Sequence, residues 1–201
     1  MLRITSQDCL NGVDREKETL YTFKGVVEYW HYGGQKIDDR KVTILSWSWG
    51  CGYRTLQTTI SWFKMNLSLQ STFPDIDDIQ LALIDVGDKP RSIYKSHDWI
   101  GSVEAGIVVQ HLTNVGPTNP VGGIKDCSSK CILAMKKNEN PDSASLLILA
   151  KFAFQAPHHN TTDEEPDLPY LWKEGWLKWC NTEDLSETDF YNMCMPMAAY
   201  K

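Results

Sequence analysis

Residues 49–63 read WGCGYRTLQTTISWF, and this stretch decides the fold class. Leu56, Ile60 and Phe63 recur at the spacing of one buried helix face. We therefore predict a buried helix that begins just after Cys51. Unpaired backbone N–H groups and the helix dipole favour a thiolate at such a position.

Cys51 is consequently a candidate nucleophile. Its neighbours Gly50 and Gly52 would let a substrate carbonyl approach closely, and N–H groups at a helix start can stabilise an oxyanion. A buried cysteine in a tight turn is the commoner explanation of an isolated Gly-Cys-Gly. The motif by itself leaves both interpretations open.

The rest of the chain shows short alternating elements without an internal repeat, which predicts one compact α+β domain of the α/β type. Aromatic and β-branched residues between 20 and 32 predict two short strands around a turn at Gly25. A helix should follow Pro74 and stop at Gly87, with Ile79, Leu83 and Val86 on one face. Further elements are expected as a helix over 103–115 with Val103, Ile107, Val108 and Leu112 inward, as strands over 130–135 and 145–154, as a surface loop over 158–169, and as an aromatic C-terminal segment packed on the domain.

Composition limits the classes of function. The chain has 201 residues, a net charge of −6 and 23% charged residues, with no Lys/Arg stripe, so we expect a folded domain that does not bind nucleic acid. No apolar run reaches the roughly 18 to 20 residues that span a bilayer. The N-terminus lacks an apolar leader, so we expect a cytoplasmic protein with reduced cysteines.

A thiolate nucleophile needs a base. His158 follows Pro157 at the end of an apolar segment, a usual place for a catalytic side chain, although a surface histidine is the commoner case. His111 is expected in the core, and His97 lies in a loop without an assigned role. The cysteines and histidines show no Cys-x-x-Cys pair and no common zinc spacing, so we expect neither a metal nor another cofactor.

The segment 49–58, together with Ser61-Trp62-Phe63, resembles the nucleophile segment of the cysteine peptidases that act on the ubiquitin-fold modifier. Further matches follow in the same order along the chain. They lie at 28–32, 38–39, 79–90 (IQLALIDVGDKP), 99–104 (WIGSVE) and 190–194 (FYNMC). The stretch 122–133 (GGIKDCSSKCIL) is similar to the shorter of the two types of this family.

The resemblance implies a papain-like fold and one peptidase domain over residues 1–201, with a core of about 20–197. It implies that Cys51 is the nucleophile, His158 the general base and Tyr32 part of the oxyanion site, with Trp49, Gly50 and Gly52 in the binding segment. The implied partners are the modifier and its conjugates, since the same chemistry trims the precursor and releases the modifier from lysine side chains. The resemblance identifies no adaptor.

Three departures from the family pattern bear on this function. Residues 41–47 (KVTILSW) are extra, and roughly two dozen residues are missing between Val115 and Pro120. Ala156 replaces the aspartate that orients the histidine, and the loss of such a carboxylate costs orders of magnitude in rate. The alternative function is therefore a catalytically impaired homologue that binds the modifier as an adaptor. An autophagy-type cysteine peptidase fits less well, because 79–90 and 99–104 match the first family.

Overall fold

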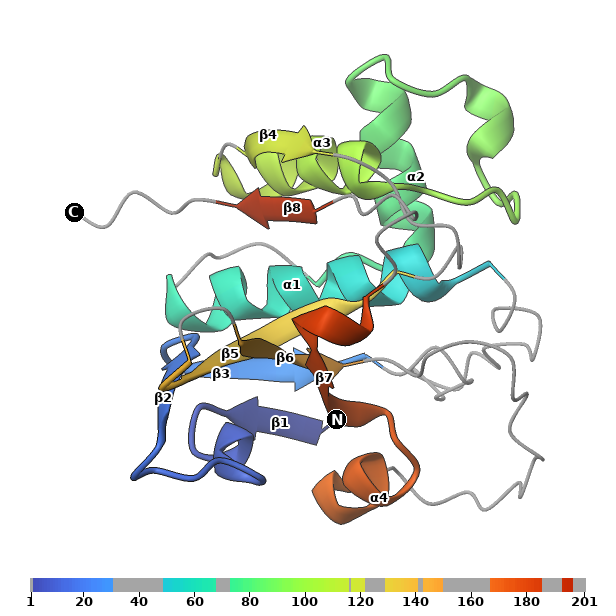
Figure 1. Ribbon diagram of the computed structural model, residues 1–201. Coiled ribbons are helices and arrows are strands. Elements are labelled where there is room, and N and C mark those ends of the chain that lie inside the picture. Colours follow the sequence, from blue (N-terminus) through green and yellow to red (C-terminus); the bar gives the residue numbers. More distant parts are fainter. Residues whose placement is uncertain are drawn as a thin grey trace.

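The computed structural model describes residues 2–30, 49–67, 73–115, 117–121, 129–140, 143–149, 167–185 and 193–196. Within these ranges, helices and short antiparallel strands are arranged around one central helix (Figure 1). No described helix combines the length and apolar character needed to cross a membrane. The predicted limits of the domain are not tested and stay a prediction.

The central helix is α1 (Cys51–Asn66), which crosses the middle of the molecule (Figure 1). It begins at Cys51 itself, whereas the sequence predicted a start just after this residue. Most of its residues are buried, because one face packs against the strands and the other against two further helices. Tyr53, Leu56, Ile60 and Phe63 point into the helical core, whereas Cys51 belongs to the core formed with the strands.

On one side of α1 lie α2 (Ile76–Asp85) and α3 (Ser102–Thr113). Asp75 caps the N-terminus of α2 reciprocally with Asp78, and Gly87 follows its end with a φ of +78° that few other residues adopt. A short 3-10 turn, Arg91–Ile93, leads toward α3. Beside α3, strand β4 (Pro117–Val121) pairs antiparallel with β8 (Met193–Pro196).

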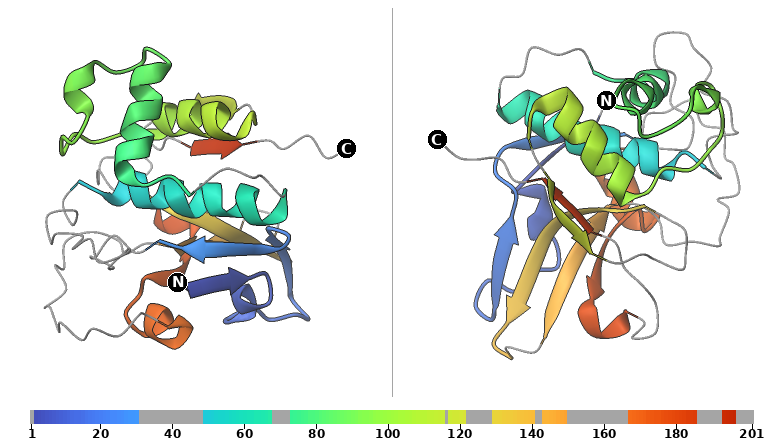
Figure 2. Two further views of the ribbon diagram at one scale, coloured as in Figure 1. Left: turned by 180° about the vertical axis from the view of Figure 1, so that it is seen from behind. Right: turned by 90° about the horizontal axis from the view of Figure 1, so that it is seen from above.

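On the other side of α1 lies a four-stranded antiparallel sheet of order β2-β5-β6-β7 (Figure 2). Its strands are β2 (Glu18–Thr22), β5 (Cys131–Asn138), β6 (Ala144–Leu149) and β7 (Leu177–Asn181). The short helix α4 (Leu168–Lys173) precedes β7. A separate pair joins β1 (Leu2–Thr5) to β3 (Val26–Tyr29), with the 3-10 turn Asp8–Leu10 after β1 and another, Thr182–Asp184, after β7.

Polar side chains of α1 bind β3 in the way that a neighbouring strand would. The main-chain N–H groups of Val26, Glu28 and Trp30 donate to side-chain oxygens of Asn66, Ser61 and Thr58, at 3.2, 2.8 and 3.1 Å. Asn66 also donates to the Val26 carbonyl at 2.8 Å. Buried backbone groups require such partners, which explains why a buried helix carries serine, threonine and asparagine.

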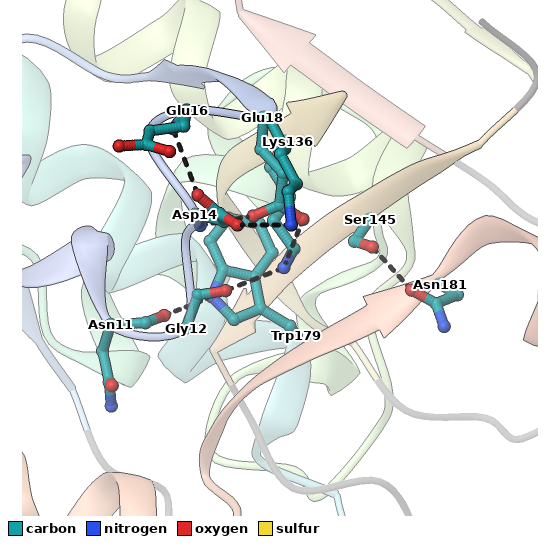
Figure 3. Close-up of polar contacts among 10 residues, drawn as sticks. Asn11, Gly12, Asp14, Glu16, Glu18, Lys136, Ser145, Trp179 and Asn181 are labelled. Carbon is teal, nitrogen blue, oxygen red and sulfur yellow. Dashed lines mark hydrogen bonds and ion pairs between the residues drawn. The ribbon is translucent and has the colours of Figure 1, made fainter. Parts of the chain in front are cut away.

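A charged cluster ties the N-terminal loop to the sheet (Figure 3). Lys136 Nζ on β5 lies 2.9 Å from a Glu18 carboxylate oxygen and donates to the Gly12 carbonyl at 2.8 Å. The same ammonium lies 5.1 Å from the centroid of the Trp179 ring. The Trp179 indole N–H in turn donates to the Asn11 carbonyl at 2.7 Å, so β2, β5 and β7 are all held to this loop.

Several sequence predictions are confirmed here. The two strands around Gly25 are β2 and β3, the helix between Pro74 and Gly87 is α2, and the apolar strand predicted after residue 144 is the interior strand β6. The aromatic C-terminal segment packs back through Trp176, which is 2% exposed, with Trp172 and Trp179 against it. Residues 150–154 lie outside the described residues.

Other details were wrong. Val103 is 49% exposed and Val86 is 41% exposed, because α3 and the end of α2 turn other residues toward the core. His111 was expected in the core but is exposed on α3, whose buried face carries Gly106, Val108 and Val109 instead. Leu168 and Pro169 begin α4, so these two residues of the predicted surface loop are helical; residues 158–166 of that prediction lie outside the described residues.

Candidate active site around Cys51

Cys51 is the first residue of α1 and is 8% exposed. Gly50 is the N-cap and supplies no side-chain cap; its carbonyl accepts the first helical hydrogen bond, from the Arg54 N–H at 3.0 Å. No acidic side chain stands in the first turn to neutralise the positive end of the helix dipole. The helix start therefore keeps its preference for a negative charge, and a Cys51 thiolate would supply it.

The sulfur of Cys51 also accepts a hydrogen bond from outside the helix. The main-chain N–H of Ser129, two residues before β5, lies 3.5 Å from Cys51 Sγ. The Ser129 carbonyl accepts a hydrogen bond of 3.3 Å from the Thr55 hydroxyl. Ser129 is therefore attached to the first two turns of α1, through its N–H to Cys51 and through its carbonyl to Thr55.

Gly52 allows another segment to touch the helix start. A Cβ atom at this position would lie 2.8 Å from the main-chain oxygen of Ile100 and 2.9 Å from its Cγ1. Real Cβ contacts are not that short, so the close approach requires glycine. The residues just before α3 therefore form one wall beside the nucleophile position.

Aromatic groups hold this wall in place. The Trp49 ring stacks on His97 with centroids 4.7 Å apart and meets Tyr53 edge-on at 5.5 Å. The Tyr53 hydroxyl donates to the Asp98 carbonyl at 2.9 Å and accepts from Gln80 Nε2 at 3.2 Å. Burial raises the pKa of Tyr53, so the phenol stays protonated and keeps donating at neutral pH.

Arg54 brings a positive charge close to the same turn. The residue is 4% exposed, and its Nη1 donates to Gln57 Oε1 at 2.8 Å. Burial lowers the pKa of Arg54 to about 10, against the opposing effect of the Asp75 carboxylate. The guanidinium is still charged at neutral pH, where it favours nearby negative charge.

Three of the other described cysteines are poor nucleophile candidates. Burial raises the pKa of Cys131 to about 11, partly offset by a hydrogen bond with Thr59, and burial also raises the pKa values of Cys9 and Cys194. Because the thiolate is the reactive form, these thiols are inert near neutral pH. No group of three or more His, Cys, Asp or Glu side chains that could hold a metal occurs among the described residues.

The remaining predicted site residues lie outside the described residues. These are Tyr32, His158 and Ala156, together with the extra stretch 41–47. Their roles therefore stay predictions. Of the predicted binding residues, Gly50 and Gly52 are buried at the helix start and Trp49 is partly buried beside them.

Three contributors to this site have little signal in the sequence. Ser129 and Ile100 act through main-chain atoms, which any residue carries, and His97 through a stacked ring. In the sequence, only Gly52 indicates that another segment of the chain approaches the start of α1 closely.

Comparisons with known proteins identify a family and related sequences. A family model described as peptidase family C78 matches residues 18–118. Ufm1-specific protease 2 of Homo sapiens is 29% identical over 214 residues, covering 93% of this chain and 42% of that protein. Ufm1-specific protease 2 of Danio rerio is 30% identical over 214 residues, covering 93% and 49%. The chain thus spans less than half the length of these curated relatives.

The fold also matches a solved structure. The crystal structure of UfSP from C. elegans superposes with a TM-score of 0.66 at 22% identity, covering 94% of this chain and 36% of that one. This confirms the expected papain-like fold with mixed helices and sheets. The similarity of residues 122–133 to the shorter of the two family types stays a prediction.

Proposed function

The chain belongs to peptidase family C78, and on this basis we propose that it is a thiol-dependent protease and isopeptidase of Ufm1. It trims the C-terminus of the Ufm1 precursor and removes Ufm1 from conjugated proteins. The family match and the names of the similar proteins, Ufm1-specific protease 2, support this substrate. The single structural observation that supports it best is Cys51 at the uncapped start of α1, with the Ser129 N–H on its sulfur.

The proposed reaction is acyl transfer through the Cys51 thiolate. The thiolate attacks the carbonyl of the C-terminal glycine of Ufm1, and N–H groups at the start of the helix stabilise the oxyanion. The C–N bond then breaks, and the amine leaves with a proton from the protonated base, which we propose is His158. Water hydrolyses the thioester, and the base takes up its proton. Tyr32 is proposed to help bind the oxyanion.

The adaptor function is the weaker alternative. A binding protein has no chemical need for a cysteine at a helix N-terminus, and the similar proteins are named as proteases. Ala156 in place of the family aspartate is expected to slow the reaction, because nothing at that position orients His158. A thiolate favoured by its position depends less on the base than a serine does.

The proposed partners are Ufm1 and its conjugates. A location in the cytoplasm is part of the same proposal.

The test is intact-mass measurement after incubation with Ufm1 that carries a C-terminal vinyl methyl ester, an alkene to which a thiolate adds irreversibly. We expect one Ufm1 per chain, no adduct with Cys51→Ala, and an undiminished adduct with Cys131→Ala as the matched control. Tight binding of unmodified Ufm1 without an adduct would overturn the peptidase proposal in favour of the adaptor. Ala156→Asp is then expected to raise the rate of adduct formation.

A further inference from the structure

Ser129 bridges one turn of α1 from outside the helix. Cys51 and Thr55 are four residues apart, so their side chains lie on the same face. The Ser129 N–H donates to Cys51 Sγ at 3.5 Å, and the Thr55 hydroxyl donates to the Ser129 carbonyl at 3.3 Å. One residue thus connects the nucleophile position to the side chain one turn later.

The chain around Ser129 is fixed from two directions. On the C-terminal side, Cys131 begins β5 and pairs with Leu149, so the sheet holds the backbone two residues away. On the helix side, Ser129 packs against the first turn, since a Cβ atom at Gly52 would lie 3.5 Å from Ser129 Oγ. The Thr55 hydroxyl fixes the carbonyl, and thereby the orientation of Ser129 above the thiol.

An N–H group aimed at sulfur distinguishes the two states of the thiol. A hydrogen bond to an ionised acceptor is shorter and about twice as strong as one to a neutral acceptor. The Ser129 N–H therefore stabilises the thiolate more than the thiol. Because this donor comes from another segment of the chain, its stabilisation of the thiolate adds to the stabilisation by the start of α1.

We propose that the main-chain N–H of Ser129 stabilises the Cys51 thiolate, and that Thr55 is a positioning residue that holds Ser129 in the required orientation. The inference rests on the proposed function in taking Cys51 as the nucleophile. It adds a residue that acts without touching the substrate.

The test compares substitutions at Thr55. Thr55→Val keeps the size and the β-branch but removes the hydroxyl, whereas Thr55→Ser keeps the hydroxyl. Thr59→Val is the matched control, since Thr59 lies one turn further along α1 and donates to the Thr55 carbonyl at 3.0 Å instead of to Ser129. If Thr55→Val does not fold, as judged by circular dichroism, the smaller Thr55→Ala gives the same comparison.

The readout is the rate at which iodoacetamide alkylates the Cys51-containing peptide, followed by mass spectrometry at pH 6.5 and pH 9.5. The ratio of the two rates reports the thiolate fraction at the lower pH. For Thr55→Val we expect this ratio to fall about three- to tenfold, the difference between a hydrogen bond to a charged acceptor and one to a neutral acceptor. Thr55→Ser and Thr59→Val should keep the wild-type ratio. A wild-type ratio in the folded Thr55→Val or Thr55→Ala protein would overturn the inference.

Alkylation needs no Ufm1, so the two proposals can fail separately. A wild-type chain that forms no Ufm1 adduct but shows the Thr55 effect contradicts the proposed function and supports this inference. The opposite result is a wild-type chain that forms the Ufm1 adduct, together with a Thr55→Val variant whose adduct rate and alkylation ratio are unchanged. That result supports the proposed function and contradicts this inference.

Discussion

The Ser61 side-chain hydroxyl on α1 accepts a 2.8 Å hydrogen bond from the main-chain N–H of Glu28 on β3. Ser61 is fully buried and also donates to the Thr58 carbonyl at 2.6 Å. Ser61→Ala would leave the Glu28 N–H without its partner, so we expect the free energy of unfolding to fall by about 1 to 3 kcal/mol. Urea denaturation measures this change. The exposed Ser92→Ala is the control and should stay within about 0.5 kcal/mol of wild type; equal values for the two variants would contradict the role of Ser61.

Gly52→Ala introduces a methyl group 2.8 Å from the Ile100 oxygen. Because that atom belongs to the backbone, either α1 or the segment before α3 must move. We expect a loss of about 1 to 3 kcal/mol in the free energy of unfolding and a larger loss of Ufm1 adduct formation, since Cys51 is adjacent. Gly52→Val should be worse than Gly52→Ala. An alanine variant with wild-type melting temperature and adduct rate would show that the close approach is unimportant.

Glu104 makes stability depend on acid. It lies 2.6 Å from Lys89 Nζ and accepts the Gly101 N–H at 2.9 Å. Burial works to raise the pKa of Glu104, but the Lys89 ammonium and the N–H groups at the start of α3 outweigh it, so the net shift is downward. A lowered folded-state pKa contributes stability that is complete above about 4.3, the unfolded value, and is lost as pH falls through the folded value.

Glu104→Gln removes this dependence. We therefore expect the difference in the free energy of unfolding between wild type and Glu104→Gln to shrink between pH 6 and pH 3, as measured by urea denaturation. Lys89→Met is the matched variant, because it removes the charge that lowers the pKa, and it should weaken the same pH dependence. A difference that is constant with pH would contradict this account.

Lys136→Met tests the cluster of Figure 3. The substitution leaves the Glu18 carboxylate and the Gly12 carbonyl without the ammonium, and both lie in a region where the Lys136 and Glu18 side chains are only 15% and 16% exposed. We expect the free energy of unfolding to fall by about 1 to 2 kcal/mol, more than for a fully exposed ion pair. Lys137→Met is the control, since this neighbour on β5 is exposed and points to the opposite face. Equal effects of the two substitutions would contradict the role of the cluster.

The helices could be predicted where one apolar face dominates. Leu56, Ile60 and Phe63 placed α1, and Asp75 with Gly87 bounded α2. In α3 apolar residues occur all round, so periodicity could not select the face that Gly106 and Val108 bury. Strand β4 contains two prolines and carries no strand pattern; its pairing with β8 depends on chain contacts about 75 residues away in sequence.

The site was predictable only where side-chain identity carries the chemistry. Cys51 between two glycines at a helix start is such a case. The hydrogen bond from Ser129 to Cys51 joins residues 78 positions apart through a main-chain N–H. Because every residue except proline carries this group, the contact cannot be predicted from residue types. The same applies to the Ile100 carbonyl over Gly52.

The pairing of β2 with β5 determines when the site can assemble during synthesis. The Thr22 hydroxyl bonds to the Leu133 carbonyl, which lies 111 residues later in the chain. At ordinary rates of translation the ribosome needs on the order of ten seconds to synthesise these 111 residues. During this time β2 cannot pair with β5, because β5 has not yet been made. Leu133, Leu147 and Leu177 also complete the core around Cys51. The thiol of residue 51 therefore gains its native surroundings only after most of the chain has been translated.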